Sequence, residues 1–187
     1  MSVGGWVALG AAALVIIWFI GNYNRLVSLR QAIKESWADI DVELKRRHDL
    51  IPNLVKVVQG YMEHERGVLE RITQLRNQAA GGTQNRKAMG EAETQLMRAV
   101  GELFAVVENY PTLKADGHFL ALQKELSITE DRIAASRRLY NGNVRGYTVL
   151  RQSFPVNFLA RSFGFVEDVD YFELASDAER VVPRVAV

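Results

Sequence analysis

Metal chemistry in a helical chain needs carboxylate and imidazole ligands that converge on one point. Di-iron sites in helical proteins use inward-facing Glu residues and Glu-x-x-His pairs. No Glu stands three positions before any of the three histidines, where the residues are Lys45, Tyr61 and Ala115. The densest ligand group is Glu63-His64-Glu65, but neighbours on a helix point about 100° apart and do not converge. We predict no metal site and interpret His64 as a surface residue.

Nucleophilic and phosphate-binding chemistry also lacks its residues. The chain has no Cys, which excludes disulfides, thiolate metal sites and cysteine nucleophiles. It has no Gly-x-Ser-x-Gly, Gly-x-x-x-x-Gly-Lys or His-Glu-x-x-His sequence. The 23 basic and 22 acidic residues give a net charge of +1, which provides no field to attract nucleic acid. We predict a protein that is not an enzyme, with no catalytic residues, no cofactor and no nucleic-acid partner.

The first segment of the chain is apolar enough to cross a membrane. Gly4 to Gly21 contains no charged residue, and at 1.5 Å per helical residue its length approaches a hydrocarbon core of about 30 Å. We predict a transmembrane anchor in residues 1–22 that contacts the lipid bilayer through Trp6, Val7, Leu9, Leu14, Val15, Ile16, Ile17, Trp18, Phe19 and Ile20. The alternatives are a cleaved signal peptide, which would need a preceding basic residue, and a buried core helix, which would be amphipathic.

Basic residues follow this segment but do not precede it. Arg25, Arg30 and Lys34 come soon after the apolar run. The positive-inside bias therefore predicts an outside N-terminus at the bacterial inner membrane and a cytoplasmic remainder of the chain.

Residues 23–148 repeat apolar positions in steps of three and four, which predicts long amphipathic helices. The series run over 26–51, 51–75, 89–110 and 116–147, with a loop at 79–85 and Asp116 as the N-cap of the last helix. Short connections make neighbouring helices antiparallel. The predicted fold is all-α, an N-terminal transmembrane helix followed by an up-and-down antiparallel four-helix bundle of long, coiled-coil-like helices.

The first two series meet at a proline. Asp49 could cap a new helix, and Pro52 would then stand in the tolerant first turn. We predict a tight helix-helix turn at these two residues. Because the two series share Ile51, the alternative is one unbroken helix of more than 50 residues, kinked at Pro52.

Charged residues occupy four positions of the apolar series, namely Arg30, Arg47, Glu65 and Glu93. A buried charge is costly unless it is paired. One interpretation is that the long side chains lie over the core while their charged ends reach water. The other is that they form ion pairs which fix the register of the helices or join subunits.

The last forty residues are too irregular for another long helix. We expect an aromatic-rich segment over 149–177 and a loose tail over 178–187. The aromatic residues are Phe154, Phe158, Phe163, Phe165, Tyr171 and Phe172. They could pack on the bundle, fill a groove of a neighbouring subunit, or contact lipid.

Several segments together resemble one family. They are Tyr23-Asn24-Arg25-Leu26-Val27, Leu44-Lys45-Arg46-Arg47-His48-Asp49-Leu50-Ile51-Pro52-Asn53-Leu54, Gly60-Tyr61-Met62-Glu63-His64-Glu65, Phe119-Leu120-Ala121-Leu122-Gln123-Lys124-Glu125-Leu126 and Phe154-Pro155-Val156-Asn157. This combination is similar to the LemA family over nearly the whole chain. The resemblance implies an N-terminal transmembrane helix, a short outside N-terminus, an up-and-down helical bundle and no established reaction. It also implies a scaffolding or membrane-shaping role, since relatives have been linked to membrane-associated organelle formation.

These features favour location and assembly over catalysis as the function. We expect a membrane-anchored structural or scaffold protein of the LemA type that forms homo-oligomers and shapes the membrane locally. Membrane tethering raises the local concentration of copies, so weak lateral contacts can assemble them. The alternative is a membrane-tethered adaptor or receptor module that recruits a soluble partner protein.

Overall fold

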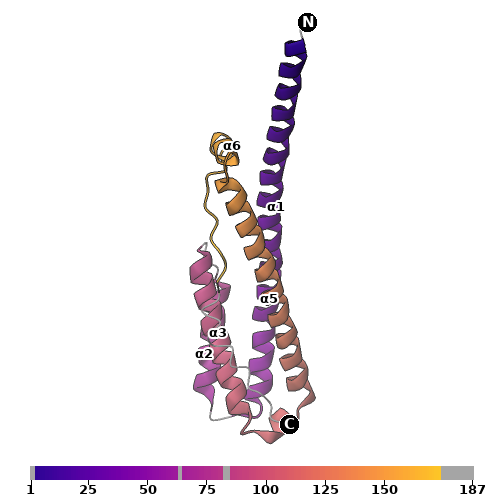
Figure 1. Cartoon of the computed structure of the whole chain (residues 1–187). Coiled ribbons are helices and arrows are strands. Elements are labelled where there is room, and N and C mark those ends of the chain that lie inside the picture. The colour runs from indigo at the N-terminus through magenta and orange to yellow at the C-terminus, as the bar shows by residue number, and fades with distance from the viewer. Residues whose placement is uncertain (1–2, 63–64, 82–84, 174–187) are drawn as a thin grey trace. The chain divides into compact units, whose positions relative to one another are not determined.

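The described part of the chain is all-helical, in agreement with the predicted all-α class. The computed structural model describes residues 3–62, 65–81 and 85–173, so the predicted tail 178–187 and His64 lie outside the described residues. The helices are α1 Val3–Gln59, α2 Arg66–Ala80, α3 Arg86–Val107, α4 Pro111–Lys114, α5 Gly117–Gln152 and α6 Val156–Ser162 (Figure 1). No strand occurs in these ranges.

The predicted turn at Asp49 and Pro52 is wrong, because both residues lie inside α1. Proline has no N–H, so Pro52 leaves the carbonyl of His48 without its helical donor. Arg76 of α2 supplies a replacement, with its Nε donating to the His48 carbonyl oxygen at 3.0 Å. The helix therefore continues through Pro52 and ends at Gln59, before Gly60. One long helix, the alternative weighed above, is what forms.

The chain divides into two compact units. The first comprises Met1–Ala38 and Arg138–Asp170, and the second comprises Asp39–Arg137 and Tyr171–Val187. The helices α1 and α5 each contribute one part to the first unit and another part to the second.

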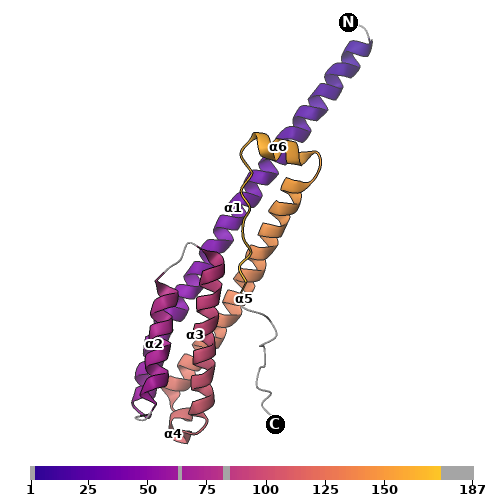
Figure 2. The same cartoon turned by 90° about the vertical axis from the view of Figure 1, so that its left-hand side faces the viewer.

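In the first unit, the part of α1 before Asp39 packs against the part of α5 after Arg137 (Figure 2). The rings of Trp37 and Tyr140 meet edge-to-face with centroids 5.3 Å apart. The side-chain amide of Asn143 donates to the Ala32 carbonyl and the Ser36 hydroxyl, both at 3.2 Å. After α6 in the chain, an irregular segment runs back along these two helices to residue 170.

In the second unit, one hydrophobic cluster is shared by the parts of α1 and α5 that belong to it and by α2, α3 and α4. Its buried members are Ile51, Leu54, Val55, Val58, Met62, Leu69, Ile72, Ala79, Leu96, Ala99, Val100, Leu103, Val107, Leu113, Phe119 and Leu126. Two caps fix where helices start. Asn85 accepts hydrogen bonds from the first backbone N–H groups of α3, and Asp116 does so for α5, as predicted.

Candidate functional site

Within the described ranges, the apolar start of α1 is left uncovered, apart from a contact of the Phe19 ring, near its end, with Phe163. Trp6 is 65% exposed and Ile17 is 66% exposed, and no residue of its most apolar 18-residue window is buried. The other predicted anchor residues are exposed as well, namely Val7, Leu9, Leu14, Val15, Ile16, Trp18, Phe19 and Ile20. Within the described ranges this is the one helix long and apolar enough to cross a membrane. Because the segment is uncovered, it is not a core helix of this chain.

A buried arginine binds two acids in the second unit. Arg47 of α1 has no exposed surface, and its Nη1 lies 2.7 Å from Oε2 of Glu93 on α3. Its Nε and Nη2 reach the two carboxylate oxygens of Glu130 on α5, at 2.7 and 2.5 Å. This bidentate geometry suits the planar guanidinium. The single side chain of Arg47 therefore ties three helices together.

Histidine 48 completes the pairing of Glu93. Its Nε2 lies 2.7 Å from Oε1 of Glu93, and the carboxylate accepts the hydrogen bond. Burial acts to raise the pKa of Glu93, but the His48 hydrogen bond and the charge and hydrogen bond of Arg47 outweigh it. The pKa of Glu93 is therefore held below its ordinary value, and the carboxylate stays ionised at neutral pH.

Ion pairs nearer the surface join two of these helices, α1 and α5. Arg46 reaches Glu125 at 2.6 Å, and Arg132 reaches Glu43 at 3.5 Å. The Arg46 and Glu125 side chains are 40% and 44% exposed, so water screens this pair. The buried pairs of Arg47 therefore constrain α1, α3 and α5 more strongly than these surface pairs.

A cleft of about 350 Å³ opens beside the buried charges. It is lined by Asp41, Leu44, Lys45, His48, Asp49, Arg76, Ala79, Ala80, Met89 and Glu93. Two of its polar side chains are already occupied, since Arg76 binds the His48 carbonyl and Glu93 binds His48 and Arg47. Across the described ranges, no three His, Cys, Asp or Glu side chains are grouped so as to hold a metal ion. The buried ion pairs connect α1, α3 and α5 beside this cleft.

The four charged residues singled out from the sequence lie in three different settings. Arg47 and Glu93 are paired with each other. Arg30 forms an exposed ion pair with Glu167 at 3.2 Å in the first unit. Glu65 stands at the N-terminus of α2, where its side chain makes no capping hydrogen bond. Sequence reasoning missed Glu130, although a step of four after Leu126 in the apolar series reaches it.

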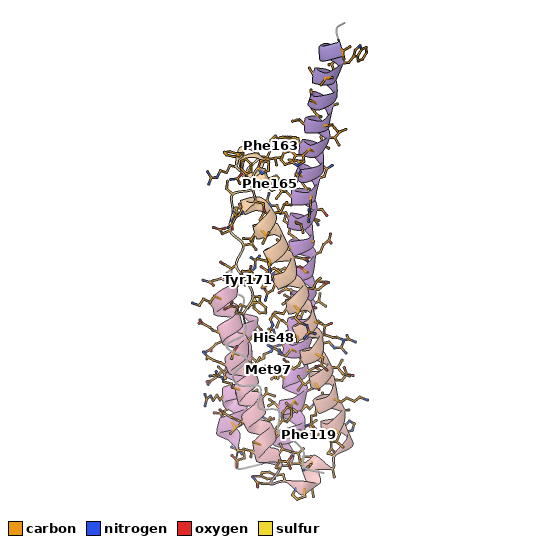
Figure 3. All side chains as sticks on the ribbon, in the orientation of Figure 1. His48, Met97, Phe119, Phe163, Phe165 and Tyr171 are labelled. Carbon is orange, nitrogen blue, oxygen red and sulfur yellow. The ribbon has the colours of Figure 1, made fainter. Side chains whose placement is uncertain are left out.

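The aromatic residues of the C-terminal segment fall into two groups. Phe165 and Phe172 are buried within their units. The others are exposed, with Phe154 at 81%, Phe158 at 62%, Phe163 at 51% and Tyr171 at 42%. Figure 3 labels Phe163, Phe165 and Tyr171 along this segment. Packing within the chain therefore accounts for two of the six residues.

The described part of the chain is that of a helical protein, and its one uncovered apolar helix indicates membrane association. The LemA family model matches residues 36–186, and the chain belongs to the LemA family. The family predicted from the sequence is thereby confirmed.

The chain is similar to curated proteins over most of its length. Magnetosome protein MamQ of Magnetospirillum gryphiswaldense is 25% identical over 209 residues, which cover 95% of this chain and 76% of MamQ. Magnetosome protein MamQ 2 of Paramagnetospirillum magneticum is 25% identical over 206 residues, or 93% of this chain and 75% of that protein. Protein LemA of Metamycoplasma hominis is 28% identical over 163 residues, or 87% and 74%. None of these names is that of an enzyme.

Proposed function

We propose that this LemA-family protein is a single-pass membrane-anchored structural protein whose copies assemble laterally at the inner membrane. One observation carries the proposal. The apolar start of α1 is uncovered and continues, without a break in the helix, into the residues that carry Arg47. A bilayer can cover such a segment, because a helix makes its backbone hydrogen bonds internally and leaves no backbone N–H or C=O group unpaired in lipid. The basic residues Arg25, Arg30 and Lys34 support an outside N-terminus.

The second unit is proposed as a rigid body for assembly. We propose that its helices form an up-and-down antiparallel four-helix bundle, in which parts of α1 and α5 join α2 and α3. The hydrophobic cluster shared by these helices supports this arrangement. The buried ion pairs of Arg47 support a fixed register, since a misaligned helix would leave a charge unpaired. A body of fixed shape can repeat the same lateral contact from copy to copy.

The similarity to magnetosome proteins supports a structural role. Three relatives carry that name, and the similarity extends over at least 93% of this chain. We propose that this chain shares with them a role in organising a membrane surface.

The assembly is tested by native mass spectrometry and electron microscopy of the full chain extracted in mild detergent. Large symmetric particles are expected. A monomer would contradict the structural role and would favour an adaptor that recruits a soluble partner.

The anchor is tested separately by washing membranes at alkaline pH. Leu14→Arg should release the protein, because a charge near the centre of a spanning helix costs about 2.5–3.5 kcal/mol. Val27→Arg is the matched control, since Val27 is an exposed apolar residue of α1 beyond the predicted anchor. If Leu14→Arg is retained as well as Val27→Arg, the segment does not span the bilayer.

A further inference from the structure

The short helix α6 turns large aromatic side chains outward. Its buried side consists of Val156, Leu159 and Ala160, whereas Phe158 is 62% exposed. Phe154, just before α6, is 81% exposed and contacts the Phe158 ring with centroids 6.1 Å apart. Exposed phenylalanines grouped at one end of a unit mark a surface that binds something apolar.

The same group is continuous with the apolar segment of α1. The Phe163 ring meets Phe19 and Tyr23 edge-to-face, at 5.4 and 5.3 Å between centroids. Phe19 belongs to the last turn of the uncharged run, and Asn22, Tyr23 and Asn24 follow it. Within the first unit, α6 therefore lies beside the point where α1 changes from apolar to polar (Figures 1 and 2). If α1 spans a bilayer, this is the level of the lipid headgroups.

The turn after α6 holds this geometry in place. Gly164 has φ of +77°, a left-handed conformation that favours glycine. The N–H of Phe165 donates to the Ala160 carbonyl at 2.8 Å, and the Gly164 N–H donates to the Arg161 carbonyl at 3.4 Å. These two bonds form a Schellman motif, which reverses the chain after a helix. Phe165 is thereby directed inward, where its ring meets Tyr23 at 5.7 Å, while Phe163 stays exposed.

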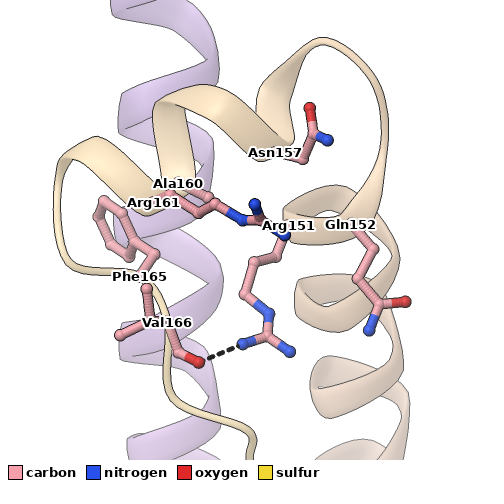
Figure 4. Close-up of a pocket in the computed structure, with 7 residues that line it drawn as sticks. All are labelled: Arg151, Gln152, Asn157, Ala160, Arg161, Phe165 and Val166. Atoms are coloured by element: carbon pink, nitrogen blue, oxygen red, sulfur yellow. Dashed lines mark hydrogen bonds between the residues drawn. The ribbon is translucent and has the colours of Figure 1, made fainter.

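Two arginines line a cleft of about 330 Å³ at the same end of the unit (Figure 4). Arg151 donates to the Val166 carbonyl at 2.6 Å and pairs with Asp168, while its buried Nε has no hydrogen-bond partner. The Arg161 side chain is exposed and extends from α6 into the cleft beside Arg151. Guanidinium groups bind phosphate oxygens through several directed N–H donors.

We propose that residues 154–163 form an interfacial contact with the bilayer, in which Phe154, Phe158 and Phe163 enter the boundary between headgroups and acyl chains. Arg161, beside Arg151, contacts the phosphates of anionic lipids. The proposal rests on the anchoring role of α1. Because Phe163 contacts Phe19 of the predicted anchor, a bilayer that surrounds the anchor also reaches this surface. A short amphipathic element with aromatic and basic residues gains apolar burial and anionic attraction together at such an interface.

The absence of Cys allows single labelling sites in the full chain. The variants Phe158→Cys, Leu14→Cys and Leu139→Cys are each labelled with an environment-sensitive NBD dye and reconstituted into phosphatidylcholine and phosphatidylglycerol bilayers. Leu139 is 55% exposed on α5 of the same unit and serves as the aqueous control. At position 158 we expect blue-shifted emission that is quenched by shallow lipid-attached spin labels. At position 14, near the middle of the predicted span, we expect quenching by deep labels, and at position 139 no quenching.

Each other outcome overturns a defined part of the proposal. A dye at 158 that emits as in water, with deep quenching at 14, overturns the interfacial contact and leaves the anchor intact. A blue-shifted dye at 158 that lipid labels do not quench shows that a second copy covers the surface instead. A dye at 14 that lipid labels do not reach contradicts the anchor itself.

The role of Arg161 is tested with Arg161→Gln in the labelled Phe158→Cys background. Arg145→Gln is the control, because Arg145 is an exposed arginine of α5 that does not line the cleft. Partial replacement of phosphatidylcholine by phosphatidylglycerol should increase the quenching at 158 in the parent protein and with Arg145→Gln. It should have no effect with Arg161→Gln. An equal response in all three proteins would overturn the phosphate contact.

Discussion

The guanidinium of Arg47 lies 2.7 Å from the carboxylate of Glu93, and neither side chain has any surface exposed to water. The two residues stand 46 positions apart in the sequence, on α1 and α3. A buried ion pair contributes little net stability compared with well-packed apolar residues, but removing one partner leaves an uncompensated charge. Fixing the register of the helices is therefore the role that we propose for this pair.

The neighbouring residues Arg46 and Arg47 allow the effect of a surface ion pair on stability to be compared with that of a buried one. Arg47→Met should lower the free energy of unfolding by about 3–5 kcal/mol, because Glu93 and Glu130 lose their common partner. Arg46→Met should cost at most about 1 kcal/mol, because its pair with Glu125 is solvated. Urea unfolding of the full chain in detergent, followed by circular dichroism, measures both. Equal small costs would show that the buried network does not constrain the fold.

Acid should remove the contribution of Glu93 to the free energy of unfolding. Its folded-state pKa is lowered from 4.5, so the stability it confers is present above pH 4.5 and is lost as the pH falls through the lower folded-state value. The difference in unfolding free energy between the parent protein and Glu93→Gln should therefore shrink below pH 4.5. Unfolding curves of the two proteins from neutral to acid pH measure it. A difference that is constant across this range would contradict an ionised Glu93.

Arg76 donates to the His48 carbonyl, which lacks a helical donor because residue 52 is a proline. Arg76→Met should cost about 0.5–1.5 kcal/mol, the net value of a typical hydrogen bond, because the His48 carbonyl loses its donor. With Pro52→Ala the restored N–H can serve that carbonyl, so the same change at Arg76 should cost less. A double-mutant cycle measures this coupling. Additive effects would mean that the two residues are independent.

Much of this fold can be predicted from the sequence. Leu26, Ile33 and Ile40 are buried where the three-and-four periodicity places them, and Asp116 caps α5. Heptad spacing reports which side of a helix is apolar. It does not report that a distant side chain will satisfy a carbonyl freed by a proline. From the sequence alone, Asp49 followed by Pro52 therefore favours the start of a new helix.

For a similar reason, the sequence could not predict which aromatic residues of the C-terminal segment are buried and which are exposed. Whether a phenylalanine is buried depends on where the backbone returns, and that is set by contacts far apart in sequence. Phe172 is buried because the chain passes close to Gly90 of α3. Phe165 is buried because the turn at Gly164 directs it toward Tyr23.

Two glycines of α3 provide a matched test of that close approach. A Cβ on Gly90 would lie 2.2 Å from the backbone oxygen of Glu173, whereas a Cβ on Gly101 would meet nothing within 4 Å. Gly90→Ala should destabilise by about 1–3 kcal/mol, as overpacking does, and should increase amide exchange around Phe172. Gly101→Ala should stabilise by about 0.5–1 kcal/mol through its helix preference. Hydrogen-exchange mass spectrometry measures the local effect, and unchanged exchange in Gly90→Ala would contradict the contact.

Lateral assembly in a membrane is the central claim, and single-molecule photobleaching tests it most directly. The full chain carrying Glu70→Cys, an exposed position of α2, is labelled with one dye and reconstituted into bilayers at low density. Spots that bleach in several steps, with a reproducible maximum, are the predicted result. Spots that bleach in one step at every protein density, from a protein shown to be fully labelled, would contradict assembly.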